Sequence, residues 1–419
     1  MDTIKTKIYS LLRRSERIFK TDMVYLVKNG SWSGFAQIAS TLLAFALSLF
    51  FANVVPKDVY GNYKFIIAAT GILGAVSLSG LGTVVTQGVA QGNEGVLKDA
   101  IRTSLRWGIL IIVIAIGSAV YYFLHGNMVL GVSLLIAGFS LPFINAYSLF
   151  GNFQGGKKDF KGYALYSTAG QAFTTILLII SAIVTKNILA IVAVYFLSSL
   201  IADIISYVRV LSVFKVNDSK DHSLIPYSKH ISVMNLFGTI ANSLDKLLVF
   251  HYLGAAELAI YSFAQAIPEQ IRGGFKSLFG IAFPKYASLS PDEVRSSIKA
   301  KIYRLTFIAA LFSLVYILAA PFIFKLLFPK YLQSVIYSQI YMLGIIAFPG
   351  ISLFATYFQL KKDTRTLYKL NVIGNITTMI FTFIFIYNFG LKGAVIENGV
   401  SWLVMLLAHW YYFVKTETV

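Results

Sequence analysis

The chain has 419 residues, of which 57% are hydrophobic and only 13% are charged, and its mean hydropathy is +0.71. A soluble globular chain carries about 25% charged residues, so the composition excludes a soluble protein and predicts an integral membrane protein. The chain has no cysteine, which excludes disulfides, thiolate metal sites and cysteine nucleophiles. Its five histidines are scattered and form no ligand pattern, so we expect no metal site and no catalytic residues.

The first 28 residues form a basic segment. They contain seven lysines and arginines, with isoleucines and leucines near helical spacing. They lack an apolar core of the length that a signal peptide needs. The pattern predicts an amphipathic segment, residues 1–28, that lies on the cytoplasmic membrane surface. A disordered basic tail is the alternative.

Twelve stretches of the remaining chain are long enough to cross a bilayer, which takes about 20 apolar residues. They lie near 30–55, 61–90, 104–124, 127–150, 162–185, 187–211, 229–253, 258–284, 302–325, 331–358, 366–388 and 391–414. The longest interior connection joins the sixth and seventh stretches. We therefore expect an N-terminal six-helix bundle at 29–211, a cytoplasmic linker at 212–228 and a C-terminal six-helix bundle at 229–419.

The positive charges test this topology. With the N-terminus inside, 27 of the 36 lysines and arginines fall in cytoplasmic segments, 5 fall in the opposite turns and the other 4 fall within spans. This bias follows the positive-inside rule and predicts that both termini are cytoplasmic. The net charge of +18 then reflects membrane orientation and contact with anionic lipids, and not the binding of nucleic acid.

The two halves of the chain resemble each other. Residues 55–65 align without gaps to residues 253–263, with a tyrosine and a phenylalanine matched and a turn former at the same place. Each segment joins the first and second spans of its half. Because each half has an even number of spans, the match predicts a parallel repeat about an axis along the membrane normal.

Two neighbouring spans carry polar rows at steps of three or four residues, which places each row on one helix face. The rows comprise Ser228, Ser232, Asn235, Thr239, Asn242 and Lys246 on the seventh span, where Asp245 precedes Lys246, and Tyr261, Gln265, Glu269, Arg272 and Lys276 on the eighth. An ionised side chain that faces lipid costs ~3 kcal/mol or more. We therefore expect the rows to face a protein interior or a water-filled cavity.

The charged members of these rows are the candidate binding residues. We expect Arg272 and Lys276 to attract an anionic group, because the guanidinium fork suits oxyanions such as phosphate, with Glu269 tuning Arg272; the family resemblance given below implies that this group is a pyrophosphate. An ion pair that only closes the cavity wall is the alternative. The other cavity candidates are Asp245, Lys246, Asn242, Gln265 and Gln37. Asp203 and Glu397, in the sixth and twelfth spans, are candidates for a proton or sodium site or for packing.

Milder polar rows on the first, fifth and eleventh spans are typical of a water-lined lumen, although serine and threonine also simply pack membrane helices. They comprise Ser33, Gln37, Ser40 and Thr41, then Ser167, Gln171 and Thr174, then Asn371, Asn375, Thr378 and Thr382.

One segment imitates a nucleotide site. The stretch 151–157 fits the phosphate-loop pattern up to its lysine, but Lys158 stands where serine or threonine is needed and no strand precedes it. We interpret it as a flexible basic cytoplasmic turn and expect no cofactor beyond possible coupling to a proton or sodium gradient.

Three motifs carry a resemblance to a known family. They are Val54-Val55-Pro56-Lys57-Asp58-Val59-Tyr60-Gly61-Asn62-Tyr63, then Asp245-Lys246-Leu247-Leu248-Val249 followed by Leu253-Gly254 and Tyr261-Ser262, and finally Gly390-Leu391-Lys392-Gly393-Ala394. They resemble the polysaccharide-export family, the Wzx-type lipid-linked oligosaccharide flippases of the MATE-like (MOP) superfamily. The first motif lacks the glycine that typically precedes its proline.

The resemblance implies an all-α membrane protein with two six-helix bundles, related by a parallel pseudo-two-fold and V-shaped around a central cavity. It implies translocation, by alternating access, of a polyprenyl-pyrophosphate-linked oligosaccharide for O-antigen or capsule assembly. The location would be the bacterial cytoplasmic (inner) membrane, and the partners could include other polysaccharide-assembly membrane proteins.

Two other functions are weighed against this one. A drug or cation antiporter of the same superfamily should carry acids at its cavity centre, and Arg272 and Lys276 argue against it. A membrane-bound polysaccharide polymerase or ligase would need an exterior catalytic loop. The outside turns span at most about ten residues, too few for such a loop.

Overall fold

The computed structural model describes residues 23–221, 223–287 and 291–415, without the side chains of 23–30, 277–292 and 294. All regular structure within these ranges is helical. By their contacts the residues form two compact units, an N unit of Asn29–Phe250 and a C unit of His251–Val419, with which the described residues before Asn29 are grouped. Most of the predicted surface segment at 1–28 lies outside the described residues.

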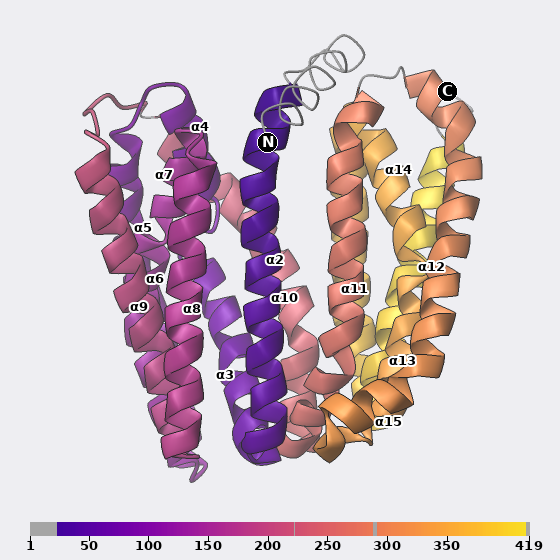
Figure 1. Ribbon diagram of the computed structural model, residues 1–419, viewed down its shortest axis with the longest axis horizontal. Helices are drawn as coiled ribbons and strands as arrows, with labels where there is room; N and C mark the ends of the chain where they lie inside the picture. Colours follow the sequence, from indigo (N-terminus) through magenta and orange to yellow (C-terminus); the bar gives the residue numbers. More distant parts are fainter. Residues whose placement is uncertain (1–22, 222, 288–290, 416–419) are drawn as a thin grey trace, which may run out of the picture. The chain divides into compact units, whose positions relative to one another are not determined.

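The N unit is an α-helical bundle (Figure 1). Within it, α6 packs against α3, α5 and α9, α8 packs against α9, and α4 packs against α7. Its helices are most of α2 (Met23–Val54), α3 (Lys57–Val76), α4 (Leu81–Ala90), α5 (Val96–Leu124), α6 (Met128–Tyr147), α7 (Leu149–Gly156), α8 (Phe160–Val184), α9 (Ile188–Val213) and most of α10 (Leu224–Leu253).

The C unit is a second bundle, in which α13 packs against α11, α12 and α15, and α14 packs against α12 and α15. Its elements are α11 (Ala255–Ala287), α12 (Pro291–Leu327), the 3-10 turn η1 (Pro329–Tyr331), α13 (Ser334–Ile345), α14 (Phe348–Leu360) and α15 (Thr364–Lys415). Gly390 kinks α15, with φ 57° and ψ −134°. Because a left-handed φ is costly for a residue with a Cβ, glycine suits this position.

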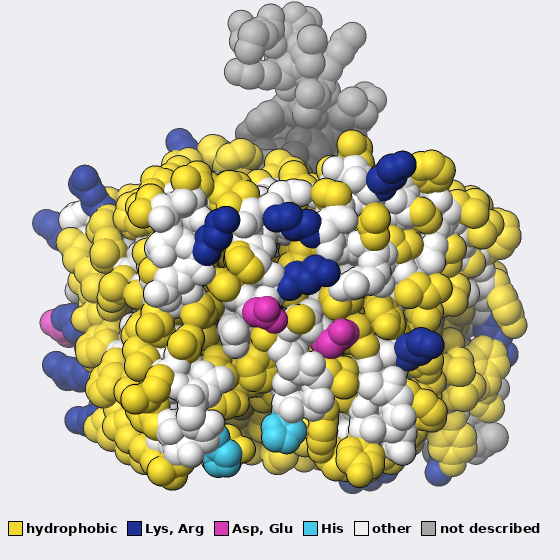
Figure 2. Space-filling model, turned by 90° about the horizontal axis from the view of Figure 1, so that it is seen from below, with side chains coloured by type: hydrophobic (Ala, Val, Ile, Leu, Met, Phe, Trp, Pro, Cys, Tyr) yellow, Lys and Arg dark blue, Asp and Glu magenta, His cyan; other side chains and the backbone are white. Residues whose placement is uncertain are grey.

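Within the described residues, nine helical segments are long and apolar enough to cross a membrane. The kink at Gly390 divides α15 into two spans, which makes ten. The helices α10 and α11 are long enough to cross a membrane but are not among the nine, because their polar rows lower their hydropathy. With these two helices the number of spans is twelve. Large hydrophobic side chains such as Leu124, Phe322 and Leu326 are 76–80% exposed, and Figure 2 shows hydrophobic side chains over most of the visible face. This confirms the predicted all-α membrane fold with twelve spans.

The structure adds a second sign of the internal repeat. The fourth span of each half is divided into two helices, α6 and α7 in the N unit and α13 and α14 in the C unit. Each divided span ends in the sequence Lys-Lys-Asp, at 157–159 and 361–363. The second lysine of each turn has a left-handed backbone, with φ 59° at Lys158 and φ 54° at Lys362.

The aspartates of these two turns also take the same role. Asp159 Oδ1 accepts a hydrogen bond from the backbone N–H of Gly162 at 3.0 Å, and Asp363 Oδ1 accepts one from Thr366 at 3.0 Å. Each carboxylate therefore caps the N-terminus of the following helix. The V-shaped arrangement of the halves around a shared cavity stays a prediction.

Hydrogen bonds and ion pairs hold the predicted linker against the loop between α4 and α5 and the start of α5. Between α9 and α10, the backbone N–H of Asn217 donates to Glu94 Oε2 at 3.1 Å, and the N–H of Gly95 donates to the carbonyl of Ser219 at 2.9 Å. Lys157 forms an ion pair with Glu94. Two outer ion pairs, Lys220–Asp99 at 2.8 Å and Lys98–Asp218 at 2.7 Å, flank this contact.

The flexible turn predicted at 151–157 is wrong. These residues continue α7 to Gly156, and Lys157 is held by Glu94. The sequence misled because the charged partner of Lys157 lies more than sixty residues earlier in the chain. Burial acts to raise the pKa of the Glu94 carboxyl, but the hydrogen bonds from Lys157 and Asn217 and the charge of Lys157 outweigh it and hold this pKa below its ordinary value.

The first part of the polar row on α10 is used in packing. Ser232 Oγ accepts a hydrogen bond from the backbone N–H of Gly80 at 2.9 Å and donates to the carbonyl of Ser228 at 2.7 Å, and both serines are buried. The contacts group α10 with the N unit as far as Phe250. The boundary predicted at 228/229 stays a prediction about the two halves of the repeat.

Candidate functional site

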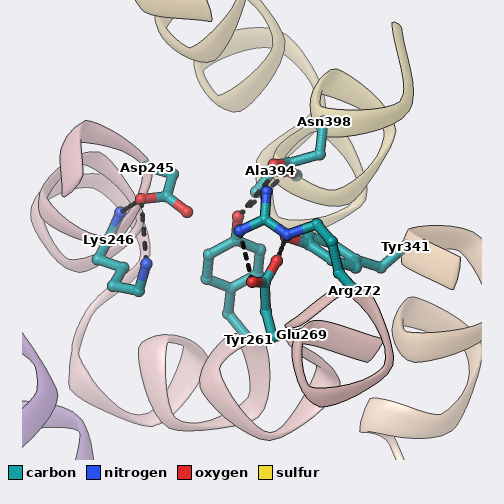
Figure 3. A network of polar contacts seen from close by, with 8 residues as sticks. All are labelled: Asp245, Lys246, Tyr261, Glu269, Arg272, Tyr341, Ala394 and Asn398. Carbon is teal, nitrogen blue, oxygen red and sulfur yellow. Dashed lines mark hydrogen bonds and ion pairs between the residues drawn. The ribbon is translucent and has the colours of Figure 1, made fainter. Parts of the chain in front are cut away.

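A charged cluster lies in the C unit where α11, α13 and α15 meet. Arg272 Nη2 lies 2.6 Å from Glu269 Oε2, an ion pair one helical turn long. The hydroxyl of Tyr341, on α13, donates to Glu269 Oε1. The guanidinium carbon of Arg272 lies 5.4 Å from the centre of the Trp402 ring on α15. Figure 3 shows the ion pair and the tyrosine contact together, so the Arg272 side chain is held from several directions.

The cluster has an excess of positive charge. Lys276, one turn beyond Arg272, is exposed and has no ion-pair partner among the side chains that the structure describes. The Arg272 side chain is itself 35% exposed, so its fork is not closed off by Glu269. Gln265, one turn before Glu269, is buried. Together Arg272 and Lys276 present donors and charge suited to a phosphate group.

A neutral polar network adjoins this cluster along α11 and α15. Asn398 Nδ2 donates to the Tyr261 hydroxyl at 3.2 Å and to the carbonyl of Ala394 at 2.9 Å (Figure 3). Beside it, Glu397 is 1% exposed and accepts a hydrogen bond from Ser401 Oγ at 2.7 Å. A carboxylate buried to this degree needs such donors to offset its loss of hydration.

The candidates of the N unit are less connected. Lys246 Nζ lies 3.5 Å from Asp245 Oδ1, and the Lys246 backbone N–H donates to the same oxygen at 2.7 Å. Asp245 is buried, whereas Asn242 is exposed on the same helix. Gln37 is exposed as well, and its amide donates along its own helix to Thr41 Oγ1 at 3.4 Å. Within the described part of the chain, no hydrogen bond or ion pair joins Asn242 or Gln37 to a charged candidate.

A cavity of about 850 Å³ lies within the N unit, walled by α2, α3, α6, α8 and α9 and by the start of α7. Four residues of the predicted milder rows line it, namely Ser40, Ser167, Gln171 and Thr174, and so does Asp203. The sequence-based prediction did not group Asp203 with these residues, although Ser199, Asp203 and Ser206 recur at steps of four and three on α9 and all three line the cavity.

The sequence missed the aromatic partners of the charged cluster. Tyr341 and Trp402 lie in apolar spans, where an aromatic side chain gives no signal of a polar role. Asn398 was missed although it follows Glu397. Lys64, a lysine within α3, is the fourth omission: its Nζ lies 5.3 Å from the centre of the Tyr60 ring, and its position inside a span could have singled it out.

The chain resembles known proteins in sequence and in structure. A family model described as "Polysaccharide biosynthesis protein" matches residues 26–290. No curated protein sequence matches the chain. Among solved structures, it is similar to an outward-facing multidrug resistance MATE family transporter of the MOP superfamily, with a TM-score of 0.64 at 13% identity, covering 94% of this chain and 95% of that one.

The chain is also similar to the lipid II flippase MurJ in an inward closed conformation, with a TM-score of 0.63 at 14% identity, covering 91% of this chain and 87% of that one. At such identities the structural likeness establishes the fold. The family match covers well over half of the chain. The chain therefore belongs to the polysaccharide biosynthesis protein family, and it is a multi-pass membrane protein with the fold of the MATE transporters.

Proposed function

We propose that this protein translocates a polyprenyl-pyrophosphate-linked oligosaccharide across the bacterial cytoplasmic membrane by alternating access, for assembly of an O-antigen or a capsule. The family match supports a role in polysaccharide biosynthesis. The observation that carries the proposal is the pair of cations on α11, because a lipid-linked glycan enters the membrane with a pyrophosphate that needs compensation.

The geometry of Arg272 fits this task. Glu269 and Trp402 orient the guanidinium, while about a third of the side chain stays exposed to receive a ligand. Lys276 supplies a second charge four residues later, on the same helix face. Charge-assisted hydrogen bonds of this kind contribute about 1.5–3 kcal/mol each. Loss of one cation should therefore lower export roughly 10- to 100-fold.

The test is export of the surface glycan in cells whose own copy of the gene is deleted. We expect Arg272→Ala, Lys276→Ala and the double variant to reach the membrane and fail to export. Arg272→Lys should retain partial activity, because the charge survives while the fork is lost. Arg209→Ala is the matched control, since Arg209 is an exposed cation at the end of α9. Normal export by the double alanine variant at normal abundance would exclude the proposed role.

Transport against a gradient also needs an energy source, and we propose Glu397 as the coupling carboxylate. It is nearly fully buried beside the Asn398–Tyr261 network of the C unit, so a change in its protonation would alter contacts between α11 and α15. Glu397→Gln should leave the protein folded and make export insensitive to the proton gradient. If that variant keeps the gradient dependence of the wild type, the coupling group lies elsewhere.

A cation or drug antiporter remains the second candidate, because the fold likeness includes a multidrug transporter and Asp203 lines the cavity of the N unit. Uptake of a fluorescent organic cation into proteoliposomes separates the two functions. We expect no such uptake. Contacts with anionic lipids and with other polysaccharide-assembly proteins belong to the same proposal.

A further inference from the structure

The cavity of the N unit is lined by hydrogen-bond acceptors that the protein leaves unused. Asn145 Nδ2 donates to Ser77 Oγ at 2.7 Å and to the carbonyl of Gly74 at 3.3 Å. Gln171 Nε2 donates to the carbonyl of Ser40 at 3.1 Å. Both amides line the cavity. Asn145 uses its two N–H donors and Gln171 uses one of its two inside the protein, so the side-chain carbonyl oxygens of both can accept from a ligand.

Asp203 adds a stronger acceptor to the same wall. Its side chain is half-buried and lines the cavity, and among the described residues nothing donates a hydrogen bond to it or pairs with its charge. A carboxylate removed from water without a donor is costly. A ligand that brings N–H or O–H groups into the cavity removes this cost.

The remaining lining is neutral and suits a sugar ring. Three tyrosines, Tyr163, Tyr166 and Tyr195, contribute both apolar ring faces and hydroxyls. Further hydroxyls come from Ser148, Thr174, Ser199 and Ser206, and no lysine or arginine lines the cavity. A volume of about 850 Å³ is at the upper end of the ~300–1,000 Å³ that small-molecule sites occupy.

The C unit has larger residues at the matching places. Gly170 on α8 faces Ala202, whereas Gly374, 204 residues later, faces the side chain of Met405. In the C unit, the Trp402 ring also packs on Gly344. The repeat therefore has bulky side chains in the C unit where the N unit keeps small ones, which indicates that the N-unit cavity serves a ligand.

We propose that this cavity binds a glycosyl residue that offers hydroxyl or amide donors and carries no negative charge, with Asp203, Asn145 and Gln171 as acceptors. The identification of the sugar as part of the cargo rests on the function proposed above. The site excludes a uronic acid at this position, because its carboxylate would meet Asp203 with no cation in the lining.

The test uses the full-length protein in lipid nanodiscs, free of glycoside detergents, and saturation-transfer difference NMR. The probes are the methyl glycosides of glucose, galactose and N-acetylglucosamine, with methyl glucuronide as the anionic comparison. We expect a signal from at least one neutral glycoside and a signal at least fivefold weaker from the glucuronide. Asp203→Asn should reduce this difference to less than twofold.

Cavity filling gives the matched pair of variants. Ser199→Phe should lower the neutral-glycoside signal at least fivefold, whereas Leu197→Phe, on the same helix with a side chain 51% exposed, should leave it unchanged. Ala202→Met copies the C unit and serves if Ser199→Phe does not fold. An unchanged signal in the folded cavity-filling variant overturns the proposal.

Two other outcomes also overturn it. The first is the absence of signal from all three neutral glycosides. The second is a sodium effect without any glycoside signal. If sodium chloride stabilises the wild type more than choline chloride does, and Asp203→Asn shows no such difference, the cavity is a cation site. Binding in nanodiscs needs no transport. Glycan export without a glycoside signal would thus refute the proposed sugar site and leave the proposed flippase function standing. A glycoside signal without export would refute the flippase function and leave the sugar site standing.

Discussion

Removing the Lys157 amine should destabilise the protein far more than removing an exposed lysine. The Glu94 side chain is 9% exposed and that of Lys157 is 26% exposed. Loss of one partner from a buried ion pair leaves an uncompensated charge and costs about 3–5 kcal/mol. The Asn217 N–H still donates to Glu94 in Lys157→Ala, so we expect the lower end, about 3 kcal/mol.

The assay is thermal unfolding in detergent, followed by circular dichroism. At ~2–4 °C per kcal/mol for units of 150–250 residues, Lys157→Ala should lower the Tm by about 6–12 °C. Lys98→Ala is the matched control, because the side chains of the Lys98–Asp218 pair are 47% and 83% exposed and such pairs add little. Adding Glu94→Gln to Lys157→Ala should recover part of the loss, since no buried charge then remains.

The pH dependence of the same pair has a definite sign. The folded pKa of Glu94 lies below its ordinary value, so the stabilisation is complete above the unfolded pKa of about 4.3 and is lost as the pH falls through the lower folded pKa. Equal Tm values for Lys157→Ala and Lys98→Ala at pH 7 would refute the reasoning.

Three further predictions concern packing, capping and topology. Gly80→Ala would place a Cβ 2.4 Å from the Ser228 carbonyl oxygen, so we expect a loss of about 1–3 kcal/mol; Gly117→Ala, with nothing within 4 Å, should not lower the Tm, and equal effects would contradict the packing. Asp363→Ala removes a helix cap worth about 1 kcal/mol. Burial acts to raise the pKa of Asp363, but the hydrogen bonds from Thr366 and the charges of Lys361 and Arg365 hold this pKa below its ordinary value. The difference in Tm between Asp363→Ala and the wild type should therefore persist at pH 5 and disappear as the pH falls through the folded pKa. Single cysteines at Lys186 and Lys330 should react with an impermeant reagent from outside, and those at Ser219 and Arg365 should not. Labelling of a cysteine at Ser219 from outside would contradict the predicted topology.

The sequence was sufficient for the spans because the length and polarity of an apolar run are local properties that the bilayer selects directly. It was also sufficient for the Glu269–Arg272 pair, since residues three apart on a helix are neighbours whatever the tertiary structure. The capped turns at Asp159 and Asp363 carry an equally local signal, an aspartate before a helix, and are therefore predictable from the sequence.

Contacts between distant parts of the chain could not be read in this way. Tyr341 and Trp402 reach Glu269 and Arg272 from other helices, and the pairing of Lys157 with Glu94 depends on how α4, α7 and the linker pack. The cavity is a still less local property. It depends on small residues of four helices, α2, α3, α8 and α9. Polar residues in separate spans do not reveal that they line the same cavity.

In the two Lys-Lys-Asp turns, a strained backbone conformation is combined with a positive charge. A left-handed backbone costs a residue with a Cβ about 1–2 kcal/mol, and glycine would avoid this cost at Lys158 and Lys362. A lysine at the surface of an anionic membrane gains about 1 kcal/mol, which nearly balances the strain. In the topology that the charge bias predicts, lysine at both places therefore costs the folded protein little. It adds two positive charges at the cytoplasmic ends of the two divided fourth spans, although glycine would be the more stable choice for the backbone.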